Sequence, residues 1–237
     1  MFNASGPMDT EIHELKALAD SSACAITTKT ATLEPRQGNA KPRYYEDGEN
    51  SVNSMGLPNP GYQEMARRIT ELKKHTQKPV FASFAGTPKE VATIATAFDE
   101  AGADVLELNL SCPNLGKAKA AREAWLDALR AVGDNSKKPL AVKAPCFLNA
   151  REQEGFCEVL DQTRVEYVAA VNSPGGGLLI NSKNEVVLKP LYGGYGGKGI
   201  KALALGNVFR YRRYFNGKKK VVGVGGVLAS VAALNGT

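Results

Sequence analysis

A regular alternation of short apolar runs and amphipathic segments constrains the fold of this 237-residue chain more than any other feature. The runs are apolar throughout rather than alternately apolar and polar, which is typical of parallel strands buried on both faces. The segments between them carry apolar residues at helical spacing, so strand and helix follow one another along the chain. We expect the strands at residues 1–5, 23–30, 79–85, 104–110, 139–144, 166–172 and 220–227.

Helix signals support this division. The clearest helix follows Thr87, which can cap its N-terminus, with Pro88 in the first helical position and Glu90 three residues after the cap. Gly102 ends that helix. The other helices are expected at residues 9–20 and 202–215 and around residues 62–72, 125–129 and 156–160.

Two long stretches interrupt the alternation. Residues 31–60 are rich in Pro, Gly and Asn, and residues 174–199 form a Gly-rich insertion. Loops of this length inside a compact domain are usually functional or disordered. Apolar residues within 52–58 indicate an ordered loop that packs back on the protein, so we expect residues 31–60 to form an active-site loop.

Polar residues follow the C-terminal ends of nearly every expected strand. They are Lys29, the stretch 109–114, Lys143, Asn172 and the pair Gly225 and Gly226. In a (β/α)8 barrel these ends meet at one mouth, where the active site lies. We therefore predict an α/β fold of the TIM-barrel type, with a doubly wound open sheet as the alternative. Residues 228–237 are too few for a full helix and a complete last strand, so we expect an incomplete barrel of about seven strands, forming a single domain over residues 1–237.

Composition and charge narrow the classes of function. Hydrophobic residues make up 43% of the chain and charged residues 23%, which is ordinary for a soluble globular protein. The net charge is 30 − 24 = +6, but the longest basic run is residues 218–220, which argues against nucleic-acid binding. The four cysteines and two histidines lie far apart, so we expect a reducing compartment and no metal site. The apolar runs are too short to span a membrane, and a cytoplasmic location is expected.

The residues expected at the mouth suit a flat, polar ring that carries negative charge. Carboxamides such as that of Asn109 can donate to and accept from a ring edge bearing C=O and N–H groups. Lys29 and Lys143 can stabilise negative charge that develops in the ring. The glycine pairs 196–197 and 225–226 allow backbone N–H groups to approach a phosphate, at the usual phosphate position of a barrel. FMN satisfies both requirements.

Cys112 differs from the other three cysteines because it lies between Ser111 and Pro113, directly after a strand. The other three are expected to be small buried hydrophobic residues. A thiolate over the face of a flavin can take a proton from carbon while hydride leaves to the flavin. We therefore expect Cys112 to be a catalytic base.

Several motifs carry a resemblance to a known family. They include ELNLSCPN at residues 107–114, SVNSMGLPN at 51–59, VNS at 171–173 and GGYGGK at 193–198. With these motifs the chain resembles dihydroorotate dehydrogenase, and it is more similar to the cytosolic class 1 enzymes, whose base is a cysteine, than to the membrane-associated class, which has serine. The resemblance extends from NASG at residues 3–6 to GVGG at 223–226. It implies a TIM barrel that binds FMN and oxidises dihydroorotate to orotate in de novo pyrimidine (UMP) biosynthesis.

The resemblance also implies a role for each matching residue. Cys112 would take the C5 proton of dihydroorotate while the C6 hydride goes to flavin N5. Lys29 matches the lysine between flavin and substrate, and Lys143 matches the lysine that stabilises negative charge on the reduced flavin. The residues that match substrate contacts are Lys29, Asn53, Met55, Gly56, Leu57, Asn109, Asn114, Asn172 and Ser173. Those that match flavin contacts are Ala4, Ser5, Gly6, Lys29, Thr30, Asn109, Lys143, Gly196, Gly197, Gly225 and Gly226.

The resemblance leaves three points open. Members of the single-chain subclass form homodimers and pass electrons to fumarate, and their loop is similar to residues 112–117, but the continuation after Lys117 differs. The acceptor is therefore either fumarate or NAD through a partner subunit. The family has a hairpin before NASG and a further helix and strand after GVGG, so a truncated, non-catalytic or unstable relative is one alternative. Another flavin barrel acting on pyrimidines, similar to dihydropyrimidine dehydrogenase, is the other.

Overall fold

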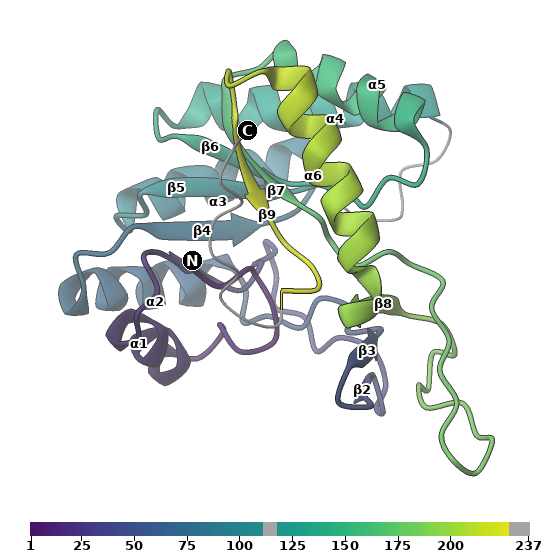
Figure 1. The fold of residues 1–237 in the computed structure, drawn as a ribbon. Coiled ribbons are helices and arrows are strands. Elements are labelled where there is room, and N and C mark those ends of the chain that lie inside the picture. Colours follow the sequence, from purple (N-terminus) through teal and green to yellow (C-terminus); the bar gives the residue numbers. More distant parts are fainter. Residues whose placement is uncertain (111–117, 228–237) are drawn as a thin grey trace.

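The computed structural model describes residues 1–110 and 118–227. Its main sheet has six parallel strands, which are neighbours in the same order as along the chain. These strands are β1 (Ile26–Thr27), β4 (Val80–Phe84), β5 (Val105–Asn109), β6 (Leu140–Lys143), β7 (Val165–Ala170) and β9 (Lys220–Gly223). The sheet curls into part of a barrel (Figure 1). A doubly wound sheet reverses its strand order at a switch point, so the sequential order confirms the predicted incomplete barrel and excludes the open-sheet alternative.

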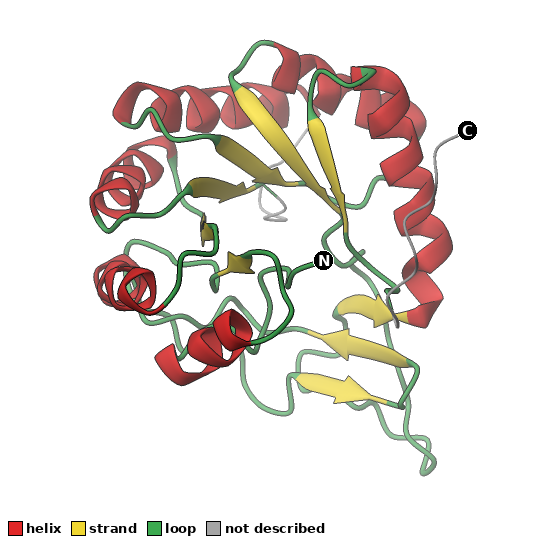
Figure 2. Cartoon of the chain, turned by 60° about the vertical axis from the view of Figure 1, so that its left-hand side comes forward, coloured by secondary structure: helices red, strands yellow, loops and turns green. Residues whose placement is uncertain are grey.

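Helices cover the outer face of this curled sheet (Figure 2). They are α1 (Ile12–Asp20), α2 (Tyr62–His75), α3 (Pro88–Glu100), α4 (Ala118–Asn135), α5 (Ala150–Asp161) and α6 (Lys201–Phe215), with a short 3-10 turn η1 (Lys198–Ile200) leading into α6. The predicted capping box of α3 is confirmed, because Thr87 Oγ1 accepts from the Glu90 N–H at 3.4 Å and Glu90 Oε2 accepts from the Thr87 N–H at 2.7 Å. Across the described ranges, no helix combines the length and the apolar character that a membrane span requires.

Strand side chains alternate between a face toward the helices and a face toward the barrel lumen. Those toward the helices form the main core; on β5 they are Leu106 and Leu108, which are buried with Phe98 of α3. The lumen is apolar at its floor, where a separate cluster contains Ala25, Phe81, Val105 and Ala141 with Phe2 and Tyr167 packed against it. Polar side chains follow nearer the C-terminal strand ends, so the barrel has an apolar floor below a polar layer.

Residues 1–5 lie against β1 but do not form the strand predicted for them. Asn3 takes the place of a strand residue through its side chain: its Oδ1 accepts from the Thr27 N–H at 2.9 Å and its Nδ2 donates to the Thr27 carbonyl at 2.7 Å. The backbone N–H of Cys24 also donates to the Met1 carbonyl at 3.0 Å. Because a side chain makes the central contacts, this edge of β1 is covered without a backbone ladder.

A second, three-stranded antiparallel sheet forms within residues 31–60 and 174–199, for which the sequence predicts loops. Its strands are β2 (Tyr44–Glu46), β3 (Asn50–Asn53) and β8 (Gly194–Gly197), in the order β2-β3-β8. Val52 is fully buried in a small cluster with Val187 and Leu188. The stretch 31–60 is thus tied to the Gly-rich stretch 174–199, and both lie at one end of the barrel (Figure 1).

Candidate active site

The C-terminal edge of the main sheet collects most of the predicted site residues. Lys29 follows β1, Asn109 ends β5 and Lys143 ends β6, and the register of the sheet places Asn109 opposite Lys143. Asn172 follows β7, and the pair Gly225 and Gly226 follows β9. The strand ends therefore bring these residues to one mouth, as the barrel architecture requires.

A ladder of hydroxyl groups joins the N-terminal segment to three strand ends below this mouth. Ser5 Oγ lies 2.9 Å from Thr30 Oγ1, which lies 2.9 Å from Ser83 Oγ on β4. Asn109 Nδ2 donates to Thr30 Oγ1 at 3.4 Å. Three predicted flavin contacts, Ser5, Thr30 and Asn109, thus share one hydrogen-bonded network.

Four buried charged residues lie in the polar layer of the lumen, and we call them the lumen quartet: Asp9, Lys29, Glu107 and Lys143. Each is at most 7% exposed. Lys29 Nζ donates to the Gly6 carbonyl at 2.6 Å, and Asp9 Oδ2 accepts from the Gly6 N–H at 2.7 Å. The backbone of Gly6, a predicted flavin contact, is therefore held at both its N–H and its carbonyl.

Burial shifts the pKa of three members of the quartet, Asp9, Lys29 and Glu107. It raises the pKa of Asp9 to about 7, although the charges of Lys29 and Lys143 and the Gly6 hydrogen bond act in the opposite direction. It lowers the pKa of Lys29, which the Asp9 carboxylate in turn opposes. It also raises the pKa of Glu107, against the charge of Lys143 and a hydrogen bond from Ser83. Perturbed titratable groups that meet in one place are typical of functional sites.

Three predicted substrate contacts meet where the small sheet approaches β7. Asn53, at the end of β3, donates from Nδ2 to the Gly194 carbonyl at 3.3 Å. A Cβ on Gly194 would lie 2.3 Å from Ser173 Oγ, so glycine allows this close approach. The Ser173 N–H donates to Asn172 Oδ1 at 2.9 Å. Residues from the two long stretches and from the end of β7 are thereby adjacent.

The remaining substrate contacts predicted in the loop form a left-handed turn after β3. Gly56 and Leu57 have φ values of +70° and +57°. The Met55 carbonyl accepts from the Asn39 N–H at 2.9 Å, and the Leu57 carbonyl accepts from Asn59 Nδ2 at 2.9 Å. The structure thus fixes this turn to its own loop, and Leu57 holds a conformation that side chains rarely adopt outside functional or strained sites.

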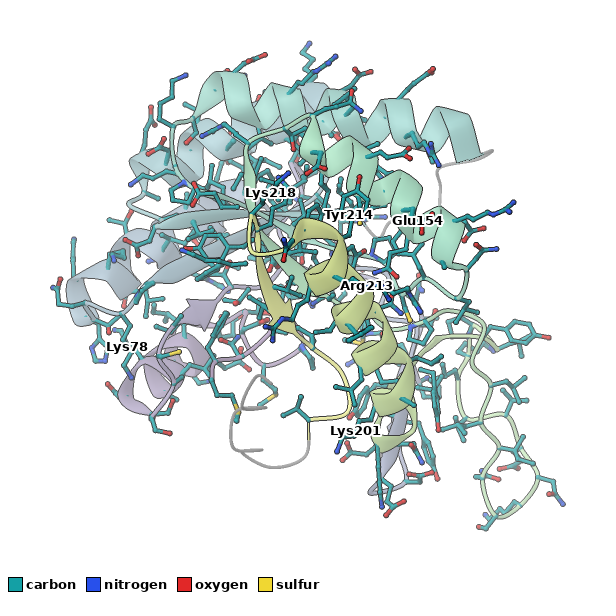
Figure 3. All side chains as sticks on the ribbon, turned by 45° about the horizontal axis from the view of Figure 1, so that its top comes forward. Lys78, Glu154, Lys201, Arg213, Tyr214 and Lys218 are labelled. Carbon is teal, nitrogen blue, oxygen red and sulfur yellow. The ribbon has the colours of Figure 1, made fainter. Side chains whose placement is uncertain are left out.

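The two predicted glycine pairs converge on the N-terminal end of η1 and α6. Gly196 and Gly197 are the last residues of β8 and lead directly into η1. A Cβ on Gly225 would lie 2.7 Å from Ile200 Cδ1, and one on Gly226 would lie 2.6 Å from Lys201 Cβ. Figure 3 shows Lys201 at the start of α6. Because a helix N-terminus favours anions, this convergence suits a phosphate group.

Two predicted residues, Cys112 and Asn114, lie outside the described residues. The structure also places two acidic residues in the site, Asp9 and Glu107, for which the sequence predicted no role there. Glu107 carried a signal, since it is a lone acid within an apolar strand. Asp9 carried none, because its burial depends on contacts with distant residues.

Two surface hollows are found within the described ranges. One is beside the start of α2 and includes Leu33, Pro35 and Tyr62; the other lies along α3 and includes Thr93 and Thr96. The first hollow borders the predicted active-site loop 31–60, but neither hollow includes a residue predicted to contact flavin or substrate. Buried charge and strand-end geometry, rather than surface shape, therefore identify the site.

We call Gly196, Gly197, Gly225 and Gly226 the glycine cradle. An incomplete (β/α) barrel with lysines, carboxamides and this glycine cradle at its C-terminal mouth belongs to the class of barrel enzymes. The dihydroorotate dehydrogenase family model matches residues 1–236. The chain is 39% identical over 236 residues to a probable dihydroorotate dehydrogenase A (fumarate) of Enterococcus faecalis, covering 96% of this chain and 76% of that protein. It is 38% identical to the dihydroorotate dehydrogenase (fumarate) of Lachancea kluyveri, covering 95% and 75%. It is also 38% identical to dihydroorotate dehydrogenase A (fumarate) of Lactococcus lactis subsp. lactis, covering 95% and 76%. The chain belongs to the dihydroorotate dehydrogenase family.

Proposed function

We propose that this protein is an FMN-dependent oxidoreductase that converts dihydroorotate to orotate in de novo pyrimidine biosynthesis, with fumarate as the electron acceptor. The observation that carries the proposal is the pair of buried lysines, Lys29 and Lys143, at a mouth that they share with Asn109. Relatives that are named for this reaction and for fumarate match nearly the whole chain. We also propose that the chain forms a single domain over residues 1–237 and that two copies of it form a homodimer in the cytoplasm.

The residues at the mouth fit FMN. The glycine cradle at the start of α6 suits the phosphate of FMN. Residues 225–226 approach η1 and α6 so closely that added Cβ atoms would clash there, and the nearby helix N-terminus favours an anion. The lumen quartet suits its ring, since two lysines offer positive charge in a water-poor place. The residues that would hold FMN are Ala4, Ser5, Gly6, Lys29, Thr30, Asn109, Lys143, Gly196, Gly197, Gly225 and Gly226. Bound FMN would supply the acceptor for the hydride that leaves C6 of the substrate.

The chain's own groups would bind and deprotonate the substrate. Carboxamides donate to and accept from the ring edge of dihydroorotate. The set consists of Lys29, Asn53, Met55, Gly56, Leu57, Asn109, Asn114, Asn172 and Ser173. Cys112 follows β5 in the sequence, and its thiolate would take the C5 proton. The electron pair of that C–H bond then forms the new C5–C6 double bond as the hydride leaves C6.

Steady-state turnover of the FMN-loaded protein tests this proposal. We expect oxidation of dihydroorotate with fumarate and no comparable turnover of dihydrouracil, which would mark the dihydropyrimidine dehydrogenase-like alternative. Cys112→Ser should lower kcat by about a hundredfold or more at neutral pH, because a hydroxyl is a much weaker base than a thiolate. Cys24 is exposed rather than buried as expected from the sequence, so Cys24→Ser is the matched control and should leave kcat unchanged. Protein that binds no FMN, or binds it without turnover, would contradict the proposal and favour a non-catalytic relative.

A further inference from the structure

Asp9 is a buried carboxyl group three residues after Gly6, and it is not among the residues that would hold FMN or substrate. It precedes α1, is 1% exposed, and its Oδ1 has no hydrogen-bond partner among the described residues. Its Oδ2 accepts from the Gly6 N–H at 2.7 Å and lies 3.5 Å from Asn3 Nδ2. Burial of a carboxyl group with an unsatisfied oxygen costs free energy, so this arrangement needs an explanation.

The same residue is tied to Lys29 by two routes. The Lys29 backbone N–H donates to the Asp9 carbonyl at 2.8 Å. Lys29 Nζ donates to the Gly6 carbonyl at 2.6 Å, while the Gly6 N–H is bound by the Asp9 carboxyl group. Asp9, Gly6 and Lys29 therefore form a closed loop of contacts that joins the N-terminal segment to the end of β1.

The charges that face Asp9 come from three strand ends. They are Lys29 after β1, Glu107 on β5 and Lys143 at the end of β6. The ammonium of Lys29 in turn faces Asp9, Lys143 and Arg43. Without the carboxylate, Lys29 would be a buried cation with two like charges in its surroundings, and burial and like charge both favour its neutral form.

We propose that Asp9 is a positioning residue whose carboxylate holds the Gly6 peptide and Lys29 against the mouth and keeps Lys29 charged where flavin and substrate would meet it. The part that concerns flavin and substrate rests on the proposed function, whereas the positioning of Gly6 and Lys29 concerns the protein alone. Because the carboxyl group titrates around neutral pH, the charge of Lys29 becomes coupled to pH through Asp9.

NMR titration of flavin-free protein tests the coupling directly. In protein labelled with ¹³C at lysine Cε, the Lys29 signal, assigned with Lys29→Arg, should titrate at least about one pH unit lower in Asp9→Asn than in the wild type, which is tenfold weaker proton binding. The exposed Asp127 of α4 provides the control, and Asp127→Asn should leave the Lys29 midpoint in place. An identical Lys29 midpoint in Asp9→Asn and wild type would overturn the proposal.

A second measurement avoids dependence on the folding of Asp9→Asn. In wild-type protein labelled with ¹³C at aspartate Cγ, the Asp9 carboxyl signal should titrate near 7, and Lys29→Met should raise that midpoint because the opposing positive charge is lost. A midpoint near the ordinary aspartate value, or one that is unmoved in Lys29→Met, would refute the coupling.

FMN-binding measurements test the role of Asp9 separately from the proposed function. Asp9→Asn should weaken FMN binding, measured by quenching of flavin fluorescence, and the loss should grow as pH rises above 7, where only the wild type gains the carboxylate. Equal FMN affinity of wild type and Asp9→Asn at every pH would overturn the functional half of the proposal. If wild-type protein shows the expected titrations but binds no FMN, the proposed function fails while the positioning of Lys29 by Asp9 stands.

Discussion

The raised pKa of Asp9 predicts an unusual dependence of stability on pH. In the unfolded chain this carboxyl group ionises near pH 4, whereas the folded protein retains its proton until about pH 7. Between these values the folded state binds more protons than the unfolded state. The free energy of unfolding therefore falls as pH rises through this window and levels off above it, which is opposite to the effect of an aspartate in an ion pair.

The magnitude follows from the size of the shift. About three pKa units at about 1.4 kcal/mol each give a loss of roughly 4 kcal/mol between pH 4 and pH 8. Asp9→Asn has no proton to lose, so the difference in unfolding free energy between wild type and Asp9→Asn should change by about this amount across the window. Titrating groups other than Lys29, whose charge depends on Asp9, are common to both proteins and largely cancel in the difference.

Urea unfolding followed by tryptophan fluorescence measures this difference. Trp125 is the only tryptophan of the chain and packs edge-on against Phe156 with ring centroids 4.9 Å apart, so its emission reports on the core. Asp127→Asn serves as the control and should follow the wild type at every pH. A wild-type minus Asp9→Asn difference that stays constant from pH 4 to pH 8 would refute the reasoning.

Three further predictions test the cradle, a helix cap and the substrate side. Gly226→Ala should lower the free energy of unfolding in urea by about 1–3 kcal/mol and weaken FMN binding. The reason is that φ is +70° and the new Cβ would lie 2.6 Å from Lys201 Cβ. Gly175→Ala is the control and should be close to neutral, because its Cβ would have no neighbour within 4 Å. Thr87→Ala should lower the free energy of unfolding by about 1 kcal/mol through loss of the α3 cap, and an unchanged urea midpoint would contradict the capping role. Asn53→Ala should reduce kcat/KM for dihydroorotate by on the order of tenfold with FMN affinity retained, since it removes one hydrogen-bonding group at the substrate side; an unchanged kcat/KM would remove Asn53 from the site.

The mouth was predictable from the sequence because strand periodicity fixes it. Once the apolar runs are taken as parallel strands, Lys29, Asn109 and Lys143 must fall at neighbouring C-terminal ends, and the structure places them there. The capping box of α3 was predictable for a similar reason, since its two partners are three residues apart. Local spacing was sufficient in both cases.

Features that depend on distant residues were not predictable. The β3–β8 pairing joins Asn50 to Gly197, and neither surrounding stretch has an alternating apolar pattern. Residues 1–5 are expected to form a strand, but the side chain of Asn3 makes the contacts that a ladder would make. The charged groups Glu107 and Lys143 that act on Asp9 likewise lie much later in the chain.

The most direct test of the central claim is an anaerobic titration of the FMN-loaded protein with dihydroorotate, followed by the visible absorbance of the flavin. We expect purified protein to retain about one FMN per chain, dihydroorotate to bleach the flavin band, and fumarate to restore it. Protein that retains no FMN, or whose flavin band is unchanged by dihydroorotate, would contradict the assignment of this mouth as a dihydroorotate-oxidising site.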